Sequence, residues 1–304
     1  MSDWTPETSL RKDPLRVLLK RGEFIDISRA GRVVPYKIYY PVDHGIEKIP
    51  VIIWSHGFGG NRDGASFLSR FFAGQGYIII HITHAGTDSS LWEGKGGHAW
   101  DVLQKATISR DDTLNRMYDI PFALDQLPHW ALENPEIGEH MDLGRICMSG
   151  HSFGAMTTQA MAGMKIPDHK NNLMNLREKR IKCGILYSPV PIDHLTDAPA
   201  ADIYGSIDIP LFHMTGTDDA SPLDGYGYEH RLVIYEHSNH PEKYLQVLGG
   251  GDHMVYNGTR GKLANNPKRE EHEEAIKIAA FAFIDAYLKG NDAAKFWLNK
   301  EYKP

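Results

Sequence analysis

A serine flanked by glycines stands at residues 150–154, Gly-His-Ser-Phe-Gly, the G-x-S-x-G pattern of a nucleophile held on a sharp turn. A strand-like apolar run precedes it at residues 143–148, and a helix-like stretch rich in Ala, Met and Thr follows at residues 155–164. Glycines are needed because a strand that reverses into a helix within one residue crowds larger neighbours. We therefore predict that Ser152 is the nucleophile of an acyl-transfer reaction, with the Phe153 N–H facing the developing oxyanion.

A serine hydroxyl needs a base to accept its proton, and that base needs a third group to fix its orientation. His253 is the predicted base, because it follows three glycines and the apolar run 244–248 and precedes the last helix-like stretch. The apolar run before that, 209–214, leads into a segment with two adjacent aspartates. Neighbouring loop residues point in different directions, so only one aspartate can meet the imidazole. We favour Asp218, with Asp219 capping the following turn.

A second oxyanion donor is expected from the loop at residues 55–60, Ser-His-Gly-Phe-Gly-Gly, which follows the strand-like run 51–54. Its glycines let the backbone approach the reacting atoms closely. We predict that the Phe58 N–H acts with the Phe153 N–H as the oxyanion hole, and that both rings line the substrate pocket. Core packing is the commoner use of the other aromatic candidates, which are Trp92, Trp100, Tyr187 and Tyr226.

The composition favours a globular enzyme with a small substrate. The 304 residues are 41% hydrophobic and 24% charged, enough to bury a large core in a single α/β domain. The net charge of -6 gives no electrostatic reason to expect nucleic acid or an anionic membrane surface as a partner. Residues 1–20 lack the apolar core of a signal peptide, and no apolar run approaches a membrane span in length. We expect a soluble, cytoplasmic protein, with Cys147 and Cys183 as free thiols in buried strands.

The order of the apolar segments predicts an α/β fold. Two alternating segments, 24–28 and 33–40, indicate an antiparallel opening hairpin. Near-continuous apolar runs follow, typical of strands covered on both faces: 51–54, 77–80, 143–148, 183–187, 209–214 and 244–248. Amphipathic stretches lie between them, at 63–73, 108–127, 155–164 and 270–288. This alternation predicts a mostly parallel central sheet flanked by helices.

The domain organisation expected is simple. Residues 1–22 are interpreted as an N-terminal extension, and residues 23–304 as a single catalytic domain. Three irregular segments, 86–104, 166–179 and 220–243, are expected to overhang the pocket. The connection from 188 to 208 is too short for a large helical lid.

Four segments together, 57–60, 150–154, 216–222 and 251–253, resemble the α/β-hydrolase superfamily. Within it, residues 55–62 and 84–90 are similar to the branch that holds dienelactone-hydrolase-like proteins, platelet-activating-factor acetylhydrolases and cutinase-like polyester hydrolases. The resemblance extends from about residue 24 to residue 288 and implies esterase activity without a cofactor. In that branch the aspartate lies four residues before a proline, which matches Asp218 with Pro222.

The chain departs from two members of that branch. Authentic dienelactone hydrolases use a cysteine nucleophile, whereas this chain has Ser152. Polyester hydrolases usually have an exposed tryptophan soon after the strand that follows the nucleophile helix, and residues 187–190, Tyr-Ser-Pro-Val, contain none. Neither a dienelactone nor a polymer is therefore the expected substrate.

The predicted function is that of a serine carboxylesterase with a small-molecule ester substrate, a Ser152-Asp218-His253 triad and no metal. Amidase, thioesterase, carbon–carbon bond hydrolase or polyester and phthalate-ester hydrolase activity would use the same triad, and a binding module with a hydrolase fold is the non-enzymatic alternative. Histidine pairs at metal-like spacing, His81/His84 and His237/His240, are a weak signal without a Cys/His cluster. Arg62 and Arg110 could hold a substrate carboxylate, although surface or structural ion pairing is expected for both.

Overall fold

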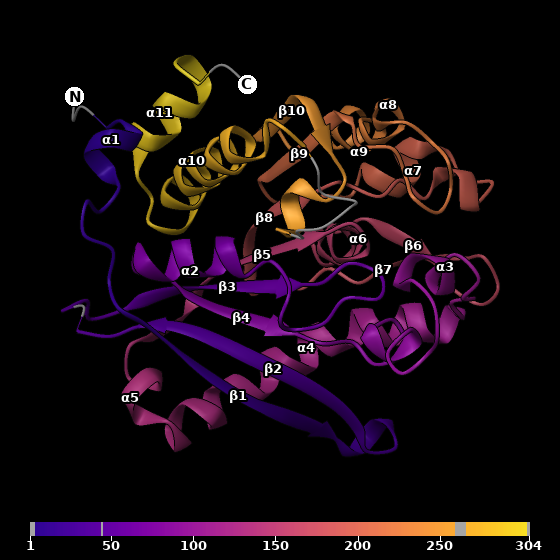
Figure 1. The fold of residues 1–304 in the computed structure, drawn as a ribbon, viewed down its shortest axis with the longest axis horizontal. Coiled ribbons are helices and arrows are strands. Elements are labelled where there is room, and N and C mark those ends of the chain that lie inside the picture. The colour runs from indigo at the N-terminus through magenta and orange to yellow at the C-terminus, as the bar shows by residue number, and fades with distance from the viewer. Residues whose placement is uncertain (1–3, 44, 259–265, 303–304) are drawn as a thin grey trace.

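The strands of the fold form where branched and aromatic apolar residues run together in the sequence. The computed structural model describes residues 4–43, 45–258 and 266–302. In this part of the chain, eight strands form one sheet in the order β1-β2-β4-β3-β5-β8-β9-β10 (Figure 1). Their bounds are β1 (Val17–Asp26), β2 (Arg32–Pro41), β3 (Ile49–Ser55), β4 (Ile78–Ile82), β5 (Met141–His151), β8 (Ile181–Tyr187), β9 (Leu211–Asp218) and β10 (Lys243–Asp252).

The sheet is mostly parallel, as predicted. β1 pairs with β2 and β2 with β4 in antiparallel register, whereas β4, β3, β5, β8, β9 and β10 pair in parallel. Ala30 and Gly31, both with positive φ, turn the opening hairpin after a short 3-10 helix, η1 (Ile27–Arg29). This α/β arrangement is compatible with an α/β hydrolase.

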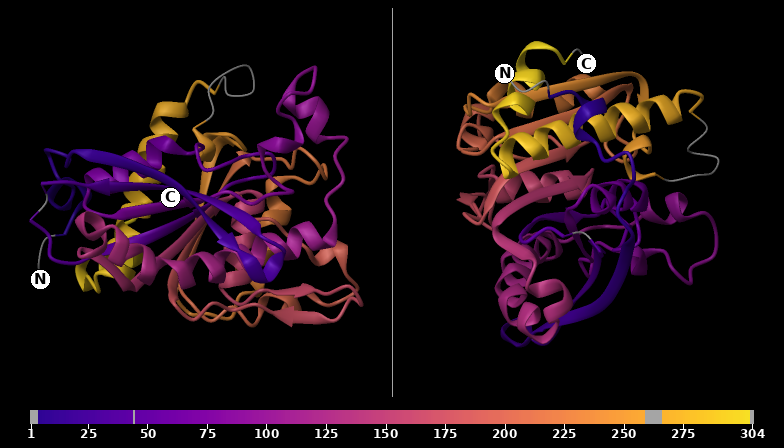
Figure 2. Two further views of the ribbon diagram at one scale, coloured as in Figure 1. Left: turned by 90° about the horizontal axis from the view of Figure 1, so that it is seen from below. Right: turned by 90° about the vertical axis from the view of Figure 1, so that its left-hand side faces the viewer.

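The predicted boundary after residue 22 does not coincide with a structural boundary. β1 begins at Val17 and is paired with β2 along its whole length. Trp4 is buried, and its Nε1 donates a hydrogen bond to Asp285 Oδ2 at 2.9 Å. Its ring also lies 5.4 Å from that of Trp297, so α1 (Pro6–Ser9) and α11 (Asp292–Lys300) lie side by side (Figures 1 and 2). Residues before the predicted boundary therefore belong to the same fold as the rest of the described chain.

Helices cover both faces of the twisted sheet (Figures 1 and 2). α2 (Ser66–Gly74) and α10 (Arg269–Leu288) pack on one face, and α4 (Arg110–Glu133) and α6 (Phe153–Met161) pack on the other. These four helices occur where the amphipathic stretches predict them, with ends shifted by a few residues, and α4 continues through two prolines. Each face carries its own apolar cluster. Cys147 and Cys183 are register partners on β5 and β8 and are buried free thiols, as expected.

Short elements occupy the connections that were expected to overhang the pocket. Residues 86–104 contain η2 (Ser89–Leu91) and α3 (Ala99–Leu103), and residues 166–179 include most of the hairpin of β6 (Lys165–Pro167) and β7 (Leu173–Asn175). The remaining short helices are α5 (Pro135–Gly138), η3 (Asp193–Leu195), α7 (Ala200–Tyr204), α8 (Tyr228–Arg231), α9 (Val233–His237) and η4 (Val255–Asn257). Across the described residues, we find no helix with the length and apolar character needed to cross a membrane.

Candidate active site

Ser152 lies on the turn that joins β5 to α6. Its backbone has φ 54° and ψ −119°, a strained conformation for a residue with a side chain. The neighbouring glycines make this turn possible. A Cβ on Gly150 would collide with the backbone of Gly154, and a Cβ on Gly154 would collide with the carbonyl of Ser55 at the end of β3. The predicted strand, sharp turn and helix are therefore present, with Ser152 at the carboxyl end of a central strand.

His253 follows β10 and is held by an aspartate, but that aspartate is Asp219. Nδ1 of His253 lies 2.6 Å from Oδ1 of Asp219, and both side chains are buried. Asp218, the residue favoured from the sequence, is exposed, and its side chain contacts Thr217 Oγ1 at 3.4 Å. The choice of Asp218 is thus corrected. β9 ends at Asp218, and the Asp219 N–H closes a turn onto the Gly216 carbonyl at 3.0 Å, which places Asp219 beside the imidazole.

Asp219 is surrounded by donors. Its Oδ2 accepts a hydrogen bond from Thr215 Oγ1 at 2.8 Å, and its Oδ1 lies 3.1 Å from Nη2 of Arg231. Burial alone would raise the pKa of this carboxyl, but the charge and hydrogen bond of His253, together with the Arg231 guanidinium, outweigh it and hold the pKa below its ordinary value. The site therefore keeps Asp219 ionised, as a carboxylate that orients an imidazole must be.

Arg231 is a residue of this site that the sequence analysis missed. Its guanidinium is buried, and besides Asp219 it donates to the carbonyl of Pro189 at 2.8 Å and lies 3.2 Å from His253 Nδ1. Its Nε donates to the Asp219 carbonyl at 2.9 Å. Arg231 thus ties the end of β9 to the segment after β8. An isolated arginine in a polar stretch gives no sequence signal of such a role.

His151, next to the serine, holds the loop of the predicted base. Its Nε2 donates to the backbone carbonyl of His253 at 2.7 Å, and the two rings lie 4.7 Å apart. Burial, followed by the charge of His253, lowers the pKa of His151 to about 3, so this ring stays neutral and remains a donor through Nε2. Ser152 and His253 line one and the same cavity.

The loop that carries Phe58 lies against the nucleophile turn. A Cβ on Gly57 would come within 3.5 Å of Ser152 Cβ, so this loop passes close to the serine. Phe58 and Phe153 both line the cavity at Ser152, with ring centroids 6.5 Å apart. Among the described residues, the N–H groups of Phe58 and Phe153 donate to no protein acceptor. Both N–H groups are therefore available to donate to a bound molecule.

Arg116 of α4 is a second arginine that the sequence analysis missed. It is fully buried, donates to the His56 carbonyl and to Ser55 Oγ, and also reaches Thr157 Oγ1 of α6 at 2.7 Å. Its guanidinium lies 4.5 Å from the centroid of the Phe153 ring. Burial lowers the pKa of Arg116 to about 9. The side chain connects the loop of Phe58 to the helix that follows Ser152.

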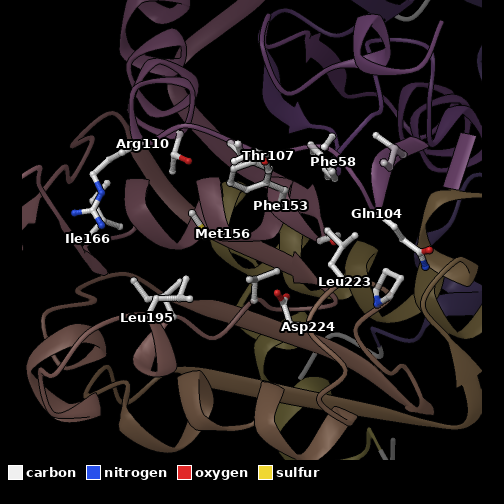
Figure 3. Close-up of a pocket in the computed structure, with 18 of the residues that line it drawn as sticks. Phe58, Gln104, Thr107, Arg110, Phe153, Met156, Ile166, Leu195, Leu223 and Asp224 are labelled. Atoms are coloured by element: carbon white, nitrogen blue, oxygen red, sulfur yellow. The ribbon is translucent and has the colours of Figure 1, made fainter. Parts of the chain in front are cut away.

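A cavity of about 910 Å³ opens beside Ser152 and Phe153 (Figure 3). Figure 3 shows Arg110 and Ile166 toward one side of it and Gln104 toward the other, with Phe153 and Met156 between them. Most of the lining is apolar. Three of the aromatic candidates face this cavity or the one beside His253, namely Trp92, Trp100 and Tyr226.

The remaining candidates from the sequence, Tyr187, Arg62 and Arg110, have packing or hydrogen-bond partners within the protein. Tyr187 is buried between Trp54 and Tyr256 rather than in a pocket. Arg62 donates to the carbonyls of Gly22 and Tyr36, at 2.7 and 3.0 Å. Arg110 lines the large cavity, but its Nη1 donates to the Asp168 carbonyl and to Asn171 Oδ1.

The comparisons with known proteins give a distant match. No protein-family model matches the chain. A platelet-activating factor acetylhydrolase from Cavia porcellus is 21% identical over 88% of this chain and 64% of its own length. One from Canis lupus familiaris is 26% identical over 55% of this chain and 39% of its own length. The chain is distantly similar to platelet-activating factor acetylhydrolase. It spans less than two thirds of the length of these relatives. This similarity and the mostly parallel sheet fit the hydrolase branch that the sequence resembles.

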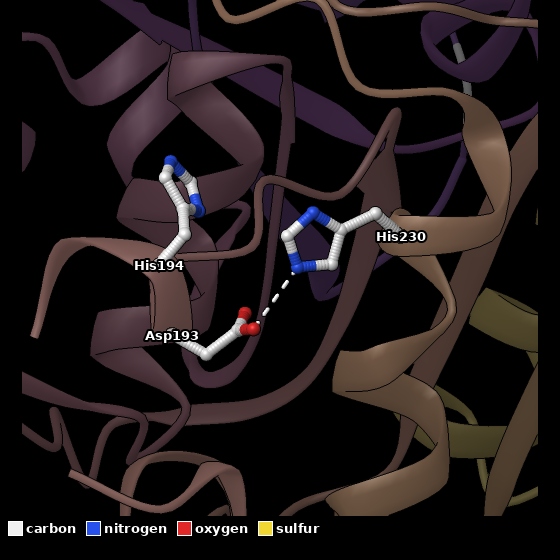
Figure 4. A group of neighbouring side chains, drawn as sticks. All are labelled: Asp193, His194 and His230. Carbon is white, nitrogen blue, oxygen red and sulfur yellow. Dashed lines mark hydrogen bonds and ion pairs between the residues drawn. The ribbon is translucent and has the colours of Figure 1, made fainter. Parts of the chain in front are cut away.

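One group of side chains in the described part of the chain has the composition of a metal site. Ligand atoms of Asp193, His194 and His230 all lie within 4.8 Å of one another (Figure 4). Asp193 already accepts from His230 Nε2 at 2.9 Å and from the Tyr204 hydroxyl at 3.1 Å. These hydrogen bonds account for the arrangement without an ion. None of the three residues lines the cavity that Ser152 and His253 share.

The two histidines of the first pair noted in the sequence, His81 and His84, have different partners. His81 Nε2 is paired with Ser69 Oγ at 2.6 Å, whereas His84 Nδ1 is paired with Asp119 Oδ2 at 3.0 Å. Burial lowers the pKa of His81 to about 3 and that of His84 to about 4. His240 Nδ1 accepts from the Glu242 N–H at 3.1 Å. His81 and His84 are therefore structural parts of the fold, whereas His237 is exposed.

Proposed function

We propose that this protein is a serine carboxylesterase that cleaves small to medium carboxylic esters through an acyl-enzyme. The observation that carries the proposal is the placement of Ser152, on a strained turn, in the same cavity as His253, whose Nδ1 lies 2.6 Å from Asp219. The distant similarity to proteins named acetylhydrolases supports an ester-hydrolysing enzyme.

In the proposed first step, Nε2 of His253 accepts the Ser152 hydroxyl proton while Oγ bonds to the ester carbonyl carbon. Asp219 stabilises the imidazolium that forms, and the N–H groups of Phe58 and Phe153 donate to the oxyanion. The tetrahedral intermediate then collapses. The bond from carbon to the alcohol oxygen breaks, and this oxygen takes the proton from His253 Nε2.

In the second step, water attacks the acyl-enzyme and gives its proton to the same imidazole. Collapse of the new intermediate returns that proton to Ser152 Oγ and releases the carboxylic acid. Each proton is received and returned by His253, so the cycle needs no metal or cofactor.

The test is hydrolysis of p-nitrophenyl butyrate by the wild type and by Ser152→Ala, at matched concentration with chelator present and folding checked by circular dichroism. The expected result is activity in the wild type and a loss of at least about three orders of magnitude in the variant. Equal activity in both proteins would refute the mechanism. Wild-type cleavage of a butyryl thioester or amide but of no ester would assign the triad to thioesterase or amidase chemistry instead.

A further inference from the structure

Two cavities of unequal size meet at Ser152. The larger measures about 910 Å³ and the smaller about 190 Å³. Five residues line both cavities: Phe58, Leu103, Ser152, Pro222 and Leu223. Phe153 and Met156 line only the larger cavity, and His253 lines only the smaller. Ser152 therefore stands between a large space on the Phe153 side and a small space on the His253 side.

The chemistry of acyl transfer assigns one half of the ester to each space. His253 must give its proton to the oxygen of the departing alcohol, so the alcohol leaves from the side of the imidazole. The acyl carbon stays bound to Ser152 Oγ, with its chain on the opposite side. The alcohol half then falls in the cavity of about 190 Å³ and the acyl half in that of about 910 Å³.

From this geometry we propose that the esterase takes neutral esters with a medium-length or aromatic acyl group and an alcohol group smaller than the acyl group. The inference rests on the proposed function and adds the substrate class to it. Sites for drug-sized ligands occupy about 300 to 1,000 Å³. The acyl space is near the upper end of that range and the alcohol space is below it.

One wall of the small cavity, formed by Trp92, is hydrogen-bonded to the loop that carries Phe58. Trp92 lines this cavity, and its Nε1 donates to the Gly59 carbonyl at 2.7 Å. Gly59 is next to Phe58, and its own N–H is fixed on the Thr87 carbonyl at 2.9 Å. A long alcohol that displaced Trp92 would loosen the loop of the proposed oxyanion donor. The alcohol space is therefore limited by the same contacts that position this loop.

The large cavity is suited to a neutral chain. Its apolar lining includes Ile108, Leu114, Met156, Ile166, Val190 and Ile192. The two charged side chains that line it, Arg110 and Asp224, each have hydrogen bonds to neutral groups. Arg110 donates to Asp168 and Asn171, and Asp224 accepts from Ser221 Oγ at 3.1 Å. These contacts of Arg110 use Nη1 alone, so the preference for a neutral acyl half rests on the apolar lining of the cavity.

This partition differs from what the relatives' name describes. An acetylhydrolase removes an acetyl group, which is a small acyl half. An acetyl ester of a long alcohol would leave the large cavity of this protein almost empty and would place its longer half on the side of the smaller cavity. We therefore infer that the substrate of this protein has a large acyl half and a smaller alcohol half.

The direct test compares two isomeric esters, methyl octanoate and heptyl acetate, which contain the same atoms divided differently about the carbonyl. The release of acid is followed by pH-stat titration with the full chain. We expect kcat/KM to favour methyl octanoate by about tenfold or more. Equal rates or a preference for heptyl acetate would overturn this inference and leave the proposed esterase function intact. If the wild type hydrolyses none of the three substrates, methyl octanoate, heptyl acetate and p-nitrophenyl butyrate, then both this inference and the proposed esterase function are overturned.

Two variants assign the preference to the cavities. Leu195 lines the large cavity and is exposed to solvent. Leu195→Trp should therefore narrow the acyl space with little risk to the fold. It should lower the ratio of methyl octanoate to methyl acetate turnover by about tenfold. Trp100→Ala widens the small cavity and should instead raise heptyl acetate turnover relative to methyl octanoate. Unchanged ratios in both folded variants would contradict the assignment of the two spaces.

Discussion

Arg231 and Asp219 form a buried pair, with Nη2 of the arginine 3.1 Å from Oδ1 of the aspartate and its Nε bonded to the aspartate's own carbonyl. The arginine thus fixes both the charge and the backbone of the residue that holds His253. This pair, rather than the aspartate alone, supports the orientation of the proposed base.

Removing the guanidinium leaves a buried carboxylate with fewer donors. We predict that Arg231→Met lowers the free energy of unfolding by about 3 kcal/mol, because breaking a buried pair from one side leaves the other charge uncompensated. Arg231→Lys should fall between the wild type and Arg231→Met, since an ammonium group restores charge but not the fork of donors. Urea unfolding at neutral pH measures both. Equal stability of Arg231→Met and the wild type would contradict the role given to the pair.

Asp218 and Asp219 form a matched pair for mutation, because they are adjacent and chemically identical. Asp219→Asn should lower kcat by about three to four orders of magnitude, as an asparagine cannot stabilise the imidazolium or fix its tautomer. Asp218→Asn should stay near wild type, because this side chain is exposed. Steady-state kinetics on p-nitrophenyl butyrate compares the two. A larger loss for Asp218→Asn would show that the exposed aspartate carries the role.

His213 on β9 is buried, and neither of its ring nitrogens has a hydrogen-bond partner among the described residues. Burial, with a smaller effect of Lys243, lowers its pKa to about 3. The unfolded chain therefore binds a proton at this histidine below about pH 6.5 while the folded chain does not, and stability is lost as the pH falls below that value.

His213→Met removes this proton uptake. We predict that the loss of unfolding free energy between pH 7 and pH 5 becomes smaller by about 2 kcal/mol in the variant. Stability at pH 7 should change little, since an unsatisfied buried polar group is replaced by an apolar one of similar size. Urea unfolding at the two pH values is the measurement. An unchanged difference between them would mean that His213 is protonated in the folded protein.

Gly154 should tolerate no side chain. A Cβ there would collide with the Ser55 and His56 carbonyls, so Gly154→Ala is expected to cost about 3 kcal/mol and to displace the turn of Ser152. Gly96 is the control, because a Cβ at that position meets nothing within 4 Å. Thermal unfolding and ester hydrolysis should separate the two variants. A Gly154→Ala protein with native stability and turnover would be incompatible with the close packing of the turn.

The sequence predicts the central strands well because each is a run of apolar residues covered on both faces. The start of β1 was missed for the opposite reason. Residues 17–22 form an edge strand with largely exposed side chains, including Leu18 and Leu19, so their apolar pattern does not stand out. A boundary drawn from composition at residue 22 therefore cuts through a strand.

Within the site, the sequence indicates motifs formed by consecutive residues. It does not indicate contacts between residues that are distant in the sequence. The nucleophile turn and the loop of Phe58 are contiguous patterns. The choice between Asp218 and Asp219 depends on which residue ends β9, where Asp218 is in register with Asp252, and two identical neighbours carry no signal of that. The partners of the two buried arginines come from other elements: hydroxyls and the His56 carbonyl for Arg116, and the Pro189 carbonyl and the Asp219 carboxylate for Arg231.

The central claim, that Ser152 is an activated nucleophile, is tested most directly by covalent labelling. The folded wild type is treated with a serine-directed fluorophosphonate at neutral pH, and the modified peptide is located by mass spectrometry. We predict a single adduct on Ser152, formed rapidly in the wild type, more slowly by orders of magnitude in Asp219→Asn, and absent in Ser152→Ala. An unlabelled wild type, or an adduct on another residue that persists in Ser152→Ala, would contradict the account.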